Sequence, residues 1–182
     1  TSYRQAKITD ILDLKAYMDT LPPVADPAPE NEVGFPFNIR RGLGLWKMLF
    51  MDQAPFEDEP SQTPQVNRGA YLVKALGHCA QCHTPRNLLG AADNTRALAG
   101  EPNPEGKGFI PNITPHPDGI GSWSEQDIAY ALETGFTPEF DSLGGSMVAV
   151  VENTSQLTTQ DREAIAAYLK SVSPLPKTGP ES

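Results

Sequence analysis

The chain has 182 residues, 38% of them hydrophobic and 20% charged, which is enough for one ordinary domain with extensions. Its 14 Lys and Arg against 23 Asp and Glu give a formal net charge of −9. This charge argues against a nucleic-acid partner and favours a partner with a basic surface, unless it serves only solubility. The chain contains no run of about 20 apolar residues, so no transmembrane segment is expected. No signal peptide is visible either.

A first helix is predicted over residues 9–21. Thr9 can cap its N-terminus, acidic residues follow in the first turn, and apolar residues recur at helical spacing. Pro22 and Pro23 end it. Met18 lies on the apolar face, which predicts a core position rather than a metal ligand.

This opening segment has a counterpart near the other end of the chain. Residues 8–23 align with residues 157–174 on a shared tyrosine. The alignment matches four positions with identical or similar residues: Asp10 with Asp161, Leu14 with Ile165, Ala16 with Ala167 and Tyr17 with Tyr168. Two unrelated amphipathic helices could match this well, because the repeat is short. The alternative is that residues 1–23 are the closing helix of an earlier, similar domain.

Residues 24–65 are predicted to be an extended linker, because proline and acidic residues dominate both of its ends. Its middle, residues 34–50, is apolar and basic. Five large apolar residues there are expected to pack against the following domain, and docking on a partner or a membrane edge is the alternative. These residues are Leu43, Trp46, Met48, Leu49 and Phe50.

Residues 66–173 are predicted to form an all-α domain, followed by a frayed tail over residues 174–182. A first helix runs into Cys79, and Gly69 on it leaves room for a second helix to approach closely. A loop rich in Gly, Pro and Asn follows over residues 84–110. Ser124 caps a helix that Gly135 stops, and Thr158 or Thr159 caps a last helix that runs to about residue 172.

The sequence Cys79-Ala80-Gln81-Cys82-His83 is a C-x-x-C-H run, which is the attachment motif for c-type haem. The two thiols add to the haem vinyl groups as thioethers, and His83 lies under the iron as the proximal ligand. A zinc site would need a second pair of ligands that the chain lacks, and a thioredoxin-like motif would need a βαβ pattern. A plain disulfide is the remaining alternative.

The sixth iron ligand decides between electron transfer and small-molecule chemistry. The side chains that could supply it are Met18, Met48, Met51, Met147, His78 and His116. Met147 is favoured, because it follows Gly144 and Gly145 in what the sequence predicts to be a flexible loop between two helices. His78 directly precedes Cys79 and should point away from the iron, and His116 is expected to be solvated in a proline-flanked loop.

The second ring nitrogen of a haem-ligating histidine usually donates to a carbonyl. The carbonyl of Pro111 is the predicted acceptor, and Asn112 and Ile113 beside it complete this part of the predicted haem-binding set. Trp123 and Arg86 are candidates for hydrogen bonds to a haem propionate, with plain packing or surface roles as the alternative.

Residues 66–173 resemble class I cytochrome c domains. The resemblance rests on CAQCHTPRN, FIPNITPHPDGIGSWSEQDI, GGSMVAVVENTSQLT and AIAAYL. It implies covalent haem on Cys79 and Cys82, axial His83 and Met147, and contact between Gly69 and Tyr168. The longer pattern is similar to multi-haem and dihaem cytochrome subunits of bacterial periplasmic dehydrogenases, in which a stretch like FPFNIRRGLGLWKMLF joins successive haem domains.

The expected fold is therefore all-α, a class I cytochrome c fold with a proline-rich N-terminal extension that carries one extra helix. The expected function is periplasmic electron transfer through one covalent haem c iron, between a redox donor and an acceptor. A periplasmic dehydrogenase or another cytochrome domain is the expected partner. The alternatives are the electron-accepting subunit of such a dehydrogenase or of a peroxidase complex, and a ligand-binding sensor haem. The orphan helix of residues 1–23 suggests that the chain is part of a longer cytochrome.

Overall fold

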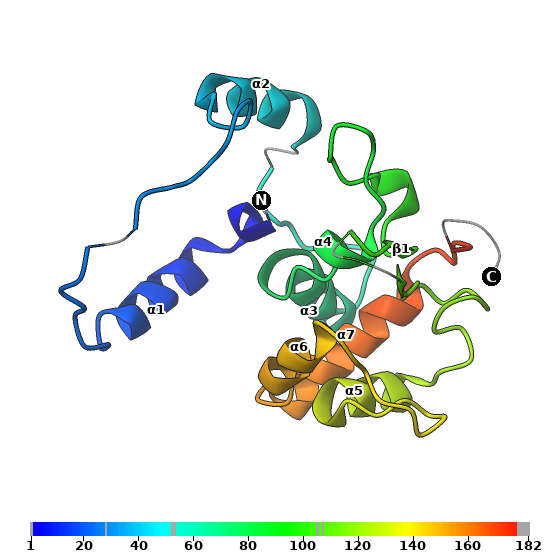
Figure 1. Cartoon of the computed structure of the whole chain (residues 1–182). Coiled ribbons are helices and arrows are strands. Elements are labelled where there is room, and N and C mark those ends of the chain that lie inside the picture. Colours follow the sequence, from blue (N-terminus) through cyan, green and yellow to red (C-terminus); the bar gives the residue numbers. More distant parts are fainter. Residues whose placement is uncertain (1, 28, 52–53, 105, 107, 178–182) are drawn as a thin grey trace.

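The computed structural model describes residues 2–27, 29–51, 54–104, 106 and 108–177. Within them the chain is mainly helical, as predicted, with one short antiparallel sheet in addition (Figure 1). The α-helices are α1 (Ile8–Met18), α2 (Arg40–Phe50), α3 (Pro64–Tyr71), α4 (Ala80–His83), α5 (Glu125–Thr134), α6 (Met147–Thr154) and α7 (Thr159–Ser171). The shorter elements are the 3₁₀ helices η1 (Ser2–Gln5) and η3 (Asn94–Arg96), the π-helix η2 (Leu72–Leu76), and the strands β1 (Glu101–Pro102) and β2 (Phe109–Ile110).

The core lies where α3 and η2, α5 and α7 pack together (Figure 1). Its buried side chains come from these helices and from the loops between them. They are Leu72, Val73, Leu98, Ile120, Ile128, Ile165, Ala166 and Leu169. This arrangement leaves α4, with the C-x-x-C-H run, attached directly to the central bundle.

The crossing of α3 and α7 depends on Gly69. A Cβ atom at residue 69 would lie 1.9 Å from the carbonyl oxygen of Ala164 and 2.8 Å from Cβ of Tyr168. Only glycine lets two backbones approach this closely. The predicted contact between Gly69 and Tyr168 is thus confirmed. An ion pair also joins the two helices, with Arg68 Nε donating to Asp161 Oδ1 at 2.7 Å.

The predicted caps of α5 and α7 are confirmed. Ser124 and Asp127 form a reciprocal capping box at the start of α5, and Gly135 ends this helix with φ +80°. Thr158 accepts a hydrogen bond from the backbone N–H of Asp161 and so caps α7.

The helix that leads to Cys79 is less regular than predicted. It changes from α to π winding at Leu72, where Gly77 N donates to Leu72 O at 2.7 Å. His78 then has φ +42°, and Cys79 N donates to Val73 O at 3.0 Å. This wider turn lets the chain reverse into α4 without a separate loop.

Two predictions for the first helix are wrong. Lys7 in extended conformation, not Thr9, precedes α1, and the Thr9 hydroxyl donates to Asp10 instead of capping. Met18 is 58% exposed rather than in the core, because none of the elements in the described part of the chain covers the apolar face of α1.

The extension contains two α-helices, not the single one predicted, and residues 24–65 are not extended throughout. Residues 40–50 form α2, a segment whose two glycines lower its intrinsic helix propensity. Only Trp46 and Phe50 are half-buried there, and Trp46 Nε1 donates to Leu89 O at 2.9 Å. Leu43, Met48 and Leu49 do not pack as predicted and stay exposed.

The tail is bound to the domain as far as residue 177, so its described part is not frayed. Leu175 N donates to Thr114 Oγ1 and Leu175 O accepts from Asn112 Nδ2. Pro176 O accepts from Arg96. Residues 178–182 lie outside the described residues. Among the residues described, no helix combines the length and apolar character needed to span a bilayer.

Candidate functional site

The C-x-x-C-H run folds into the single helical turn of α4. His83 N donates to Cys79 O at 3.0 Å, so this turn holds both thiols and the imidazole on one short rigid element. Cys82 is exposed, Cys79 is partly buried, and both are free thiols. Burial raises the pKa of the Cys79 thiol to about 11.

His83 is buried, with 6% of its surface exposed. Its Nδ1 lies 2.7 Å from the carbonyl oxygen of Pro111, the acceptor that the sequence suggested. Burial lowers the pKa of His83, and the Pro111 carbonyl opposes this shift only in part. When Nδ1 carries the proton it donates to Pro111, which leaves Nε2 as the nitrogen for a metal.

Two neighbours of Pro111 hold this carbonyl in place. Asn112 is buried, its Oδ1 accepts from Thr114 N at 2.8 Å, and its Nδ2 donates to Leu175 O at 2.7 Å. Ile113 N donates to Leu98 O at 2.9 Å. Asn112 and Ile113 therefore fix the loop that faces His83, and their contact with haem stays a prediction.

The chain after His83 is held by residues that the sequence reasoning did not single out. Thr84 is 1% exposed and its Oγ1 accepts from Leu98 N. Gly100 N donates to His83 O at 2.7 Å, and Gly100 has φ +77°. A Cβ atom there would lie 2.5 Å from Ile110 O. Among the many glycines of this loop, no local pattern in the sequence distinguishes Gly100.

Arg86 and Trp123, the two candidates for propionate binding, both contact other parts of the domain. Arg86 donates to Gln81 O at 2.7 Å and to Gly90 O at 3.0 Å, and it lies 4.0 Å from the buried carboxylate of Glu101. Burial raises the pKa of Glu101, and Arg86 opposes this shift. Trp123 packs against the core, and its propionate contact, like that of Arg86, stays a prediction.

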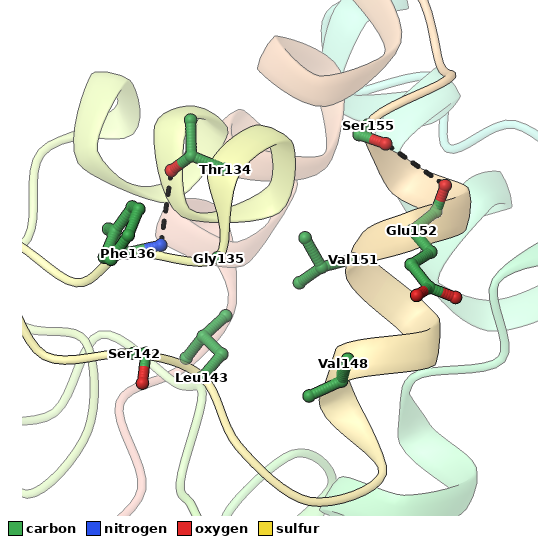
Figure 2. Close-up of a pocket in the computed structure, with 9 residues that line it drawn as sticks. All are labelled: Thr134, Gly135, Phe136, Ser142, Leu143, Val148, Val151, Glu152 and Ser155. Atoms are coloured by element: carbon green, nitrogen blue, oxygen red, sulfur yellow. Dashed lines mark hydrogen bonds between the residues drawn. The ribbon is translucent and has the colours of Figure 1, made fainter.

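Met147 is the first residue of α6, not part of a flexible loop as predicted. It is partly buried, and its N–H donates to Gly144 O at 3.2 Å. The next residue, Val148, lines a cavity of about 300 Å³ between the end of α5 and α6. Figure 2 shows Leu143, Val148 and Val151 pointing into this space. The candidate distal ligand thus lies beside an apolar hollow.

Three of the other candidate ligands either contact other side chains or are exposed. The His78 ring packs edge-on against Tyr3, with centroids 5.4 Å apart. His116 Nδ1 lies 3.2 Å from Asp118. Met48 is exposed on α2. Within the described part of the chain, no group of three or more His, Cys, Asp or Glu side chains could hold a metal ion, so the zinc alternative lacks ligands there.

These residues fit a c-type haem. Two free thiols and a buried imidazole lie on one turn, and the imidazole is held by a carbonyl in the tautomer that iron requires. The family model for cytochrome c matches residues 66–173. The chain belongs to the cytochrome c family. It is an electron carrier, and the family implies covalent haem c at the C-x-x-C of residues 79–82.

Longer proteins are similar to this cytochrome over nearly its whole length. A "Diheme cytochrome c-type" protein of Cereibacter sphaeroides is 54% identical over 173 residues, which are 94% of this chain and 57% of that protein. The "Fructose dehydrogenase cytochrome subunit" of Gluconobacter japonicus is 39% identical over 174 residues, 94% of this chain and 35% of the subunit. The "Alcohol dehydrogenase (quinone), cytochrome c subunit" of Gluconacetobacter polyoxogenes is 36% identical over 184 residues, 96% of this chain and 39% of the subunit.

The predicted resemblance to dihaem cytochromes and dehydrogenase cytochrome subunits is therefore confirmed. The chain spans little more than half the length of the first of these relatives and less of the others.

Proposed function

We propose that this cytochrome carries one electron at a time on a single haem c that Cys79 and Cys82 bind covalently. His83 and Met147 are its axial ligands. The observation that carries the proposal is the environment of His83, a buried imidazole whose Nδ1 lies 2.7 Å from Pro111 O. When bound, the haem supplies a one-electron iron couple.

The chain's own residues prepare the site for that couple. The Pro111 carbonyl fixes the His83 ring, so that Nε2 points in one direction in both oxidation states. Burial keeps the imidazole neutral and therefore able to ligate. A thioether such as Met147 favours the reduced iron and raises the potential, and no proton donor or substrate pocket is required.

The distal ligand is tested by Met147→Ala, with Met48→Ala as the matched control because Met48 is exposed on α2. The Met147 variant should lose the sulfur-to-iron charge-transfer band of the ferric haem and should bind carbon monoxide when reduced. The control should keep the band and bind none. The same measurement on the unaltered protein separates an electron carrier from a sensor haem. An unchanged band in Met147→Ala would exclude Met147.

We also propose that the cytochrome works in the periplasm, as a domain of a longer dihaem or multi-haem cytochrome or as the electron-accepting subunit of a dehydrogenase. The names of its longer relatives support this role. Cell fractionation followed by purification of the native gene product tests it. A second haem domain or a dehydrogenase subunit should accompany residues 1–182. A native mass equal to this chain plus one haem, without a partner, would contradict the proposal.

A further inference from the structure

The helices α1 and α7 match at several aligned positions but lie in opposite environments. In α7, Ile165 and Leu169 are 6% and 5% exposed. Their counterparts in α1, Leu14 and Met18, are 57% and 58% exposed. The apolar side chains that α7 buries in the haem domain thus have exposed counterparts in α1.

The features that seat α7 on α3 are repeated in α1. Tyr168 meets Gly69, and its counterpart Tyr17 is 63% exposed. Asp161 pairs with Arg68, and its counterpart Asp10 accepts a hydrogen bond from the Tyr71 hydroxyl. This bond fixes the start of α1 beside α3, while the rest of the helix runs away from the bundle (Figure 1).

A second uncovered surface lies on α2. Leu43, Leu45, Met48 and Leu49 are 51%, 56%, 71% and 63% exposed. The sequence has no acidic residue over residues 33–51, although three cations lie on α2 and the whole chain has a net charge of −9. The hydrogen bond from Trp46 to Leu89 O ties this helix to the loop that follows the haem-attachment turn.

Both surfaces belong to the same extension. Each helix contacts the haem domain through one of these hydrogen bonds, but most of its large apolar side chains stay exposed. Exposed apolar area of this extent marks a surface that another body covers.

We infer that α1 and α2 together hold a second cytochrome c domain, with α1 as the closing helix of that domain and α2 against its surface. This inference rests on the proposed function. The cations of α2 complement an acidic body, and a haem domain with two propionates is one. Since 173 residues are 57% of the dihaem relative, about 130 of its residues lie outside the match, enough for one more domain like residues 66–173.

Two positions of α1 limit how the second domain can pack on it. Asp13 and Lys15 take the positions of Ala164 and Ala166, which are 2% and 0% exposed in α7. The ammonium group of Lys15 pairs with Asp19, the C-cap residue of α1. The second domain therefore leaves these positions of α1 open to water, because a lysine reaches solvent along the helix surface.

A membrane surface explains these contacts less well. Leu and Trp beside Arg and Lys on α2 suit an anionic bilayer. Asp10 and Asp13 on α1, Asp19 at its C-cap, and the net charge of −9 on the chain all oppose binding to an anionic bilayer. An internal match to the closing helix of a haem domain has no role at a bilayer.

The test uses the native, full-length gene product with its haem. A photo-crosslinking amino acid replaces Tyr17 on α1 or Leu49 on α2, and Glu163 on the exposed side of α7 serves as control. Mass spectrometry should show that residues 17 and 49 both reach peptides of one domain with its own C-x-x-C-H sequence. The control should reach none of these peptides. Leu14→Asp should lower both yields about tenfold, as loss of a buried anchor does.

Adducts with phospholipid, with a protein that lacks haem, or with two different bodies would overturn the inference, and so would the absence of crosslinks to a haem domain. The absorption spectrum of each variant reports separately on the haem of residues 66–173. An unchanged spectrum without these crosslinks would reject the second-domain surface and leave the electron-carrier function in place. A spectrum without His and Met ligation would reject that function instead.

Discussion

A histidine that ligates iron must be neutral and must hold one ring nitrogen toward the metal. Burial and the Pro111 carbonyl meet both conditions at His83. The acceptor itself is held by the buried amide of Asn112, which donates to Leu175 O beyond α7. A tail residue thus contributes, through two hydrogen bonds, to the orientation of His83, the proposed proximal ligand.

Thr84 tests the support of the chain directly after His83. Its hydroxyl oxygen is the acceptor for the buried N–H of Leu98. Thr84→Val keeps the shape but leaves that N–H without a partner, so the free energy of unfolding should fall by about 1–3 kcal/mol. Thr84→Ser keeps the acceptor and should lose only about 1 kcal/mol for one methyl group. Denaturant unfolding measures both, and a Val variant as stable as Ser would contradict this account.

At the residue scale, the sequence predicts features that depend on residues close together along the chain. The spacing of the two cysteines and the histidine predicted the haem-attachment turn. The proline-containing loop after it suggested the Pro111 carbonyl as the partner of His83. Thr84 and Gly100 could not be found this way, because their roles depend on Leu98 and Ile110, which only the folded chain brings to them.

At the scale of elements too, features that depend on neighbouring residues were predicted, and features that depend on distant contacts were not. The capping residues of α5 and α7 act on their own first turns, so the sequence was sufficient to place them. Gly144 and Gly145 suggested that Met147 lies in a loop, but Met147 begins α6. The proline-rich, acidic ends of residues 24–65 suggested an extended linker, but residues 40–50 form α2. The exposed face of α1 was also missed, because periodicity shows that a face is apolar but not what covers it.

Gly69 is the element-scale position with the largest predicted effect. Gly69→Ala places a Cβ atom 1.9 Å from the Ala164 carbonyl oxygen and must push α3 away from α7. The free energy of unfolding should fall by about 3 kcal/mol. Gly144→Ala is the matched control, because nothing lies within 4 Å of its Cβ, and it should be neutral or up to about 1 kcal/mol more stable. Equal denaturation midpoints for the two variants would show that the helices tolerate separation.

The pair of Arg68 and Asp161 makes this crossing sensitive to acid. Hydrogen bonding to Arg68 lowers the pKa of Asp161 below its ordinary value of 3.8. The unfolded chain therefore takes up this proton first, and the stability from the pair is complete above about pH 4 and is lost as pH falls through the lowered pKa.

Asp161→Asn should therefore cost about 1 kcal/mol at neutral pH, the upper range for a partly exposed pair. The difference from the unaltered protein should shrink below pH 4. Unfolding curves at pH 7 and pH 3 measure it, with Glu139→Gln on the surface as control. A difference that stays constant with pH would assign the effect to the α7 cap rather than to the ion pair.

At the scale of the whole molecule, the N-terminal extension contacts the haem domain but leaves the apolar faces of α1 and α2 exposed. Lys7 N donates to the Tyr71 hydroxyl, and the rings of Phe56 and Tyr71 lie 5.1 Å apart, so the start of α1 and the segment before α3 meet on the haem domain. No sequence pattern predicts these contacts, since they join residues more than ten positions apart without periodicity. At the scale of the whole molecule, the property that the sequence does predict is the net charge.

The charge of −9 predicts how salt changes electron transfer at the proposed haem, whose two propionates would add to this charge. Oxidation of the reduced cytochrome by hexaammineruthenium(III), a cation, should slow as ionic strength rises, because salt screens the attraction. Oxidation by ferricyanide, an anion, should speed up, because salt screens a repulsion. Both effects should level off above about 0.1 M salt, where the Debye length is about 10 Å. Stopped-flow rates measure the two slopes. Ferricyanide rates that fall with salt would instead indicate local positive charge at the edge, for which Arg86 is a candidate because it donates to Gln81 O within the attachment turn.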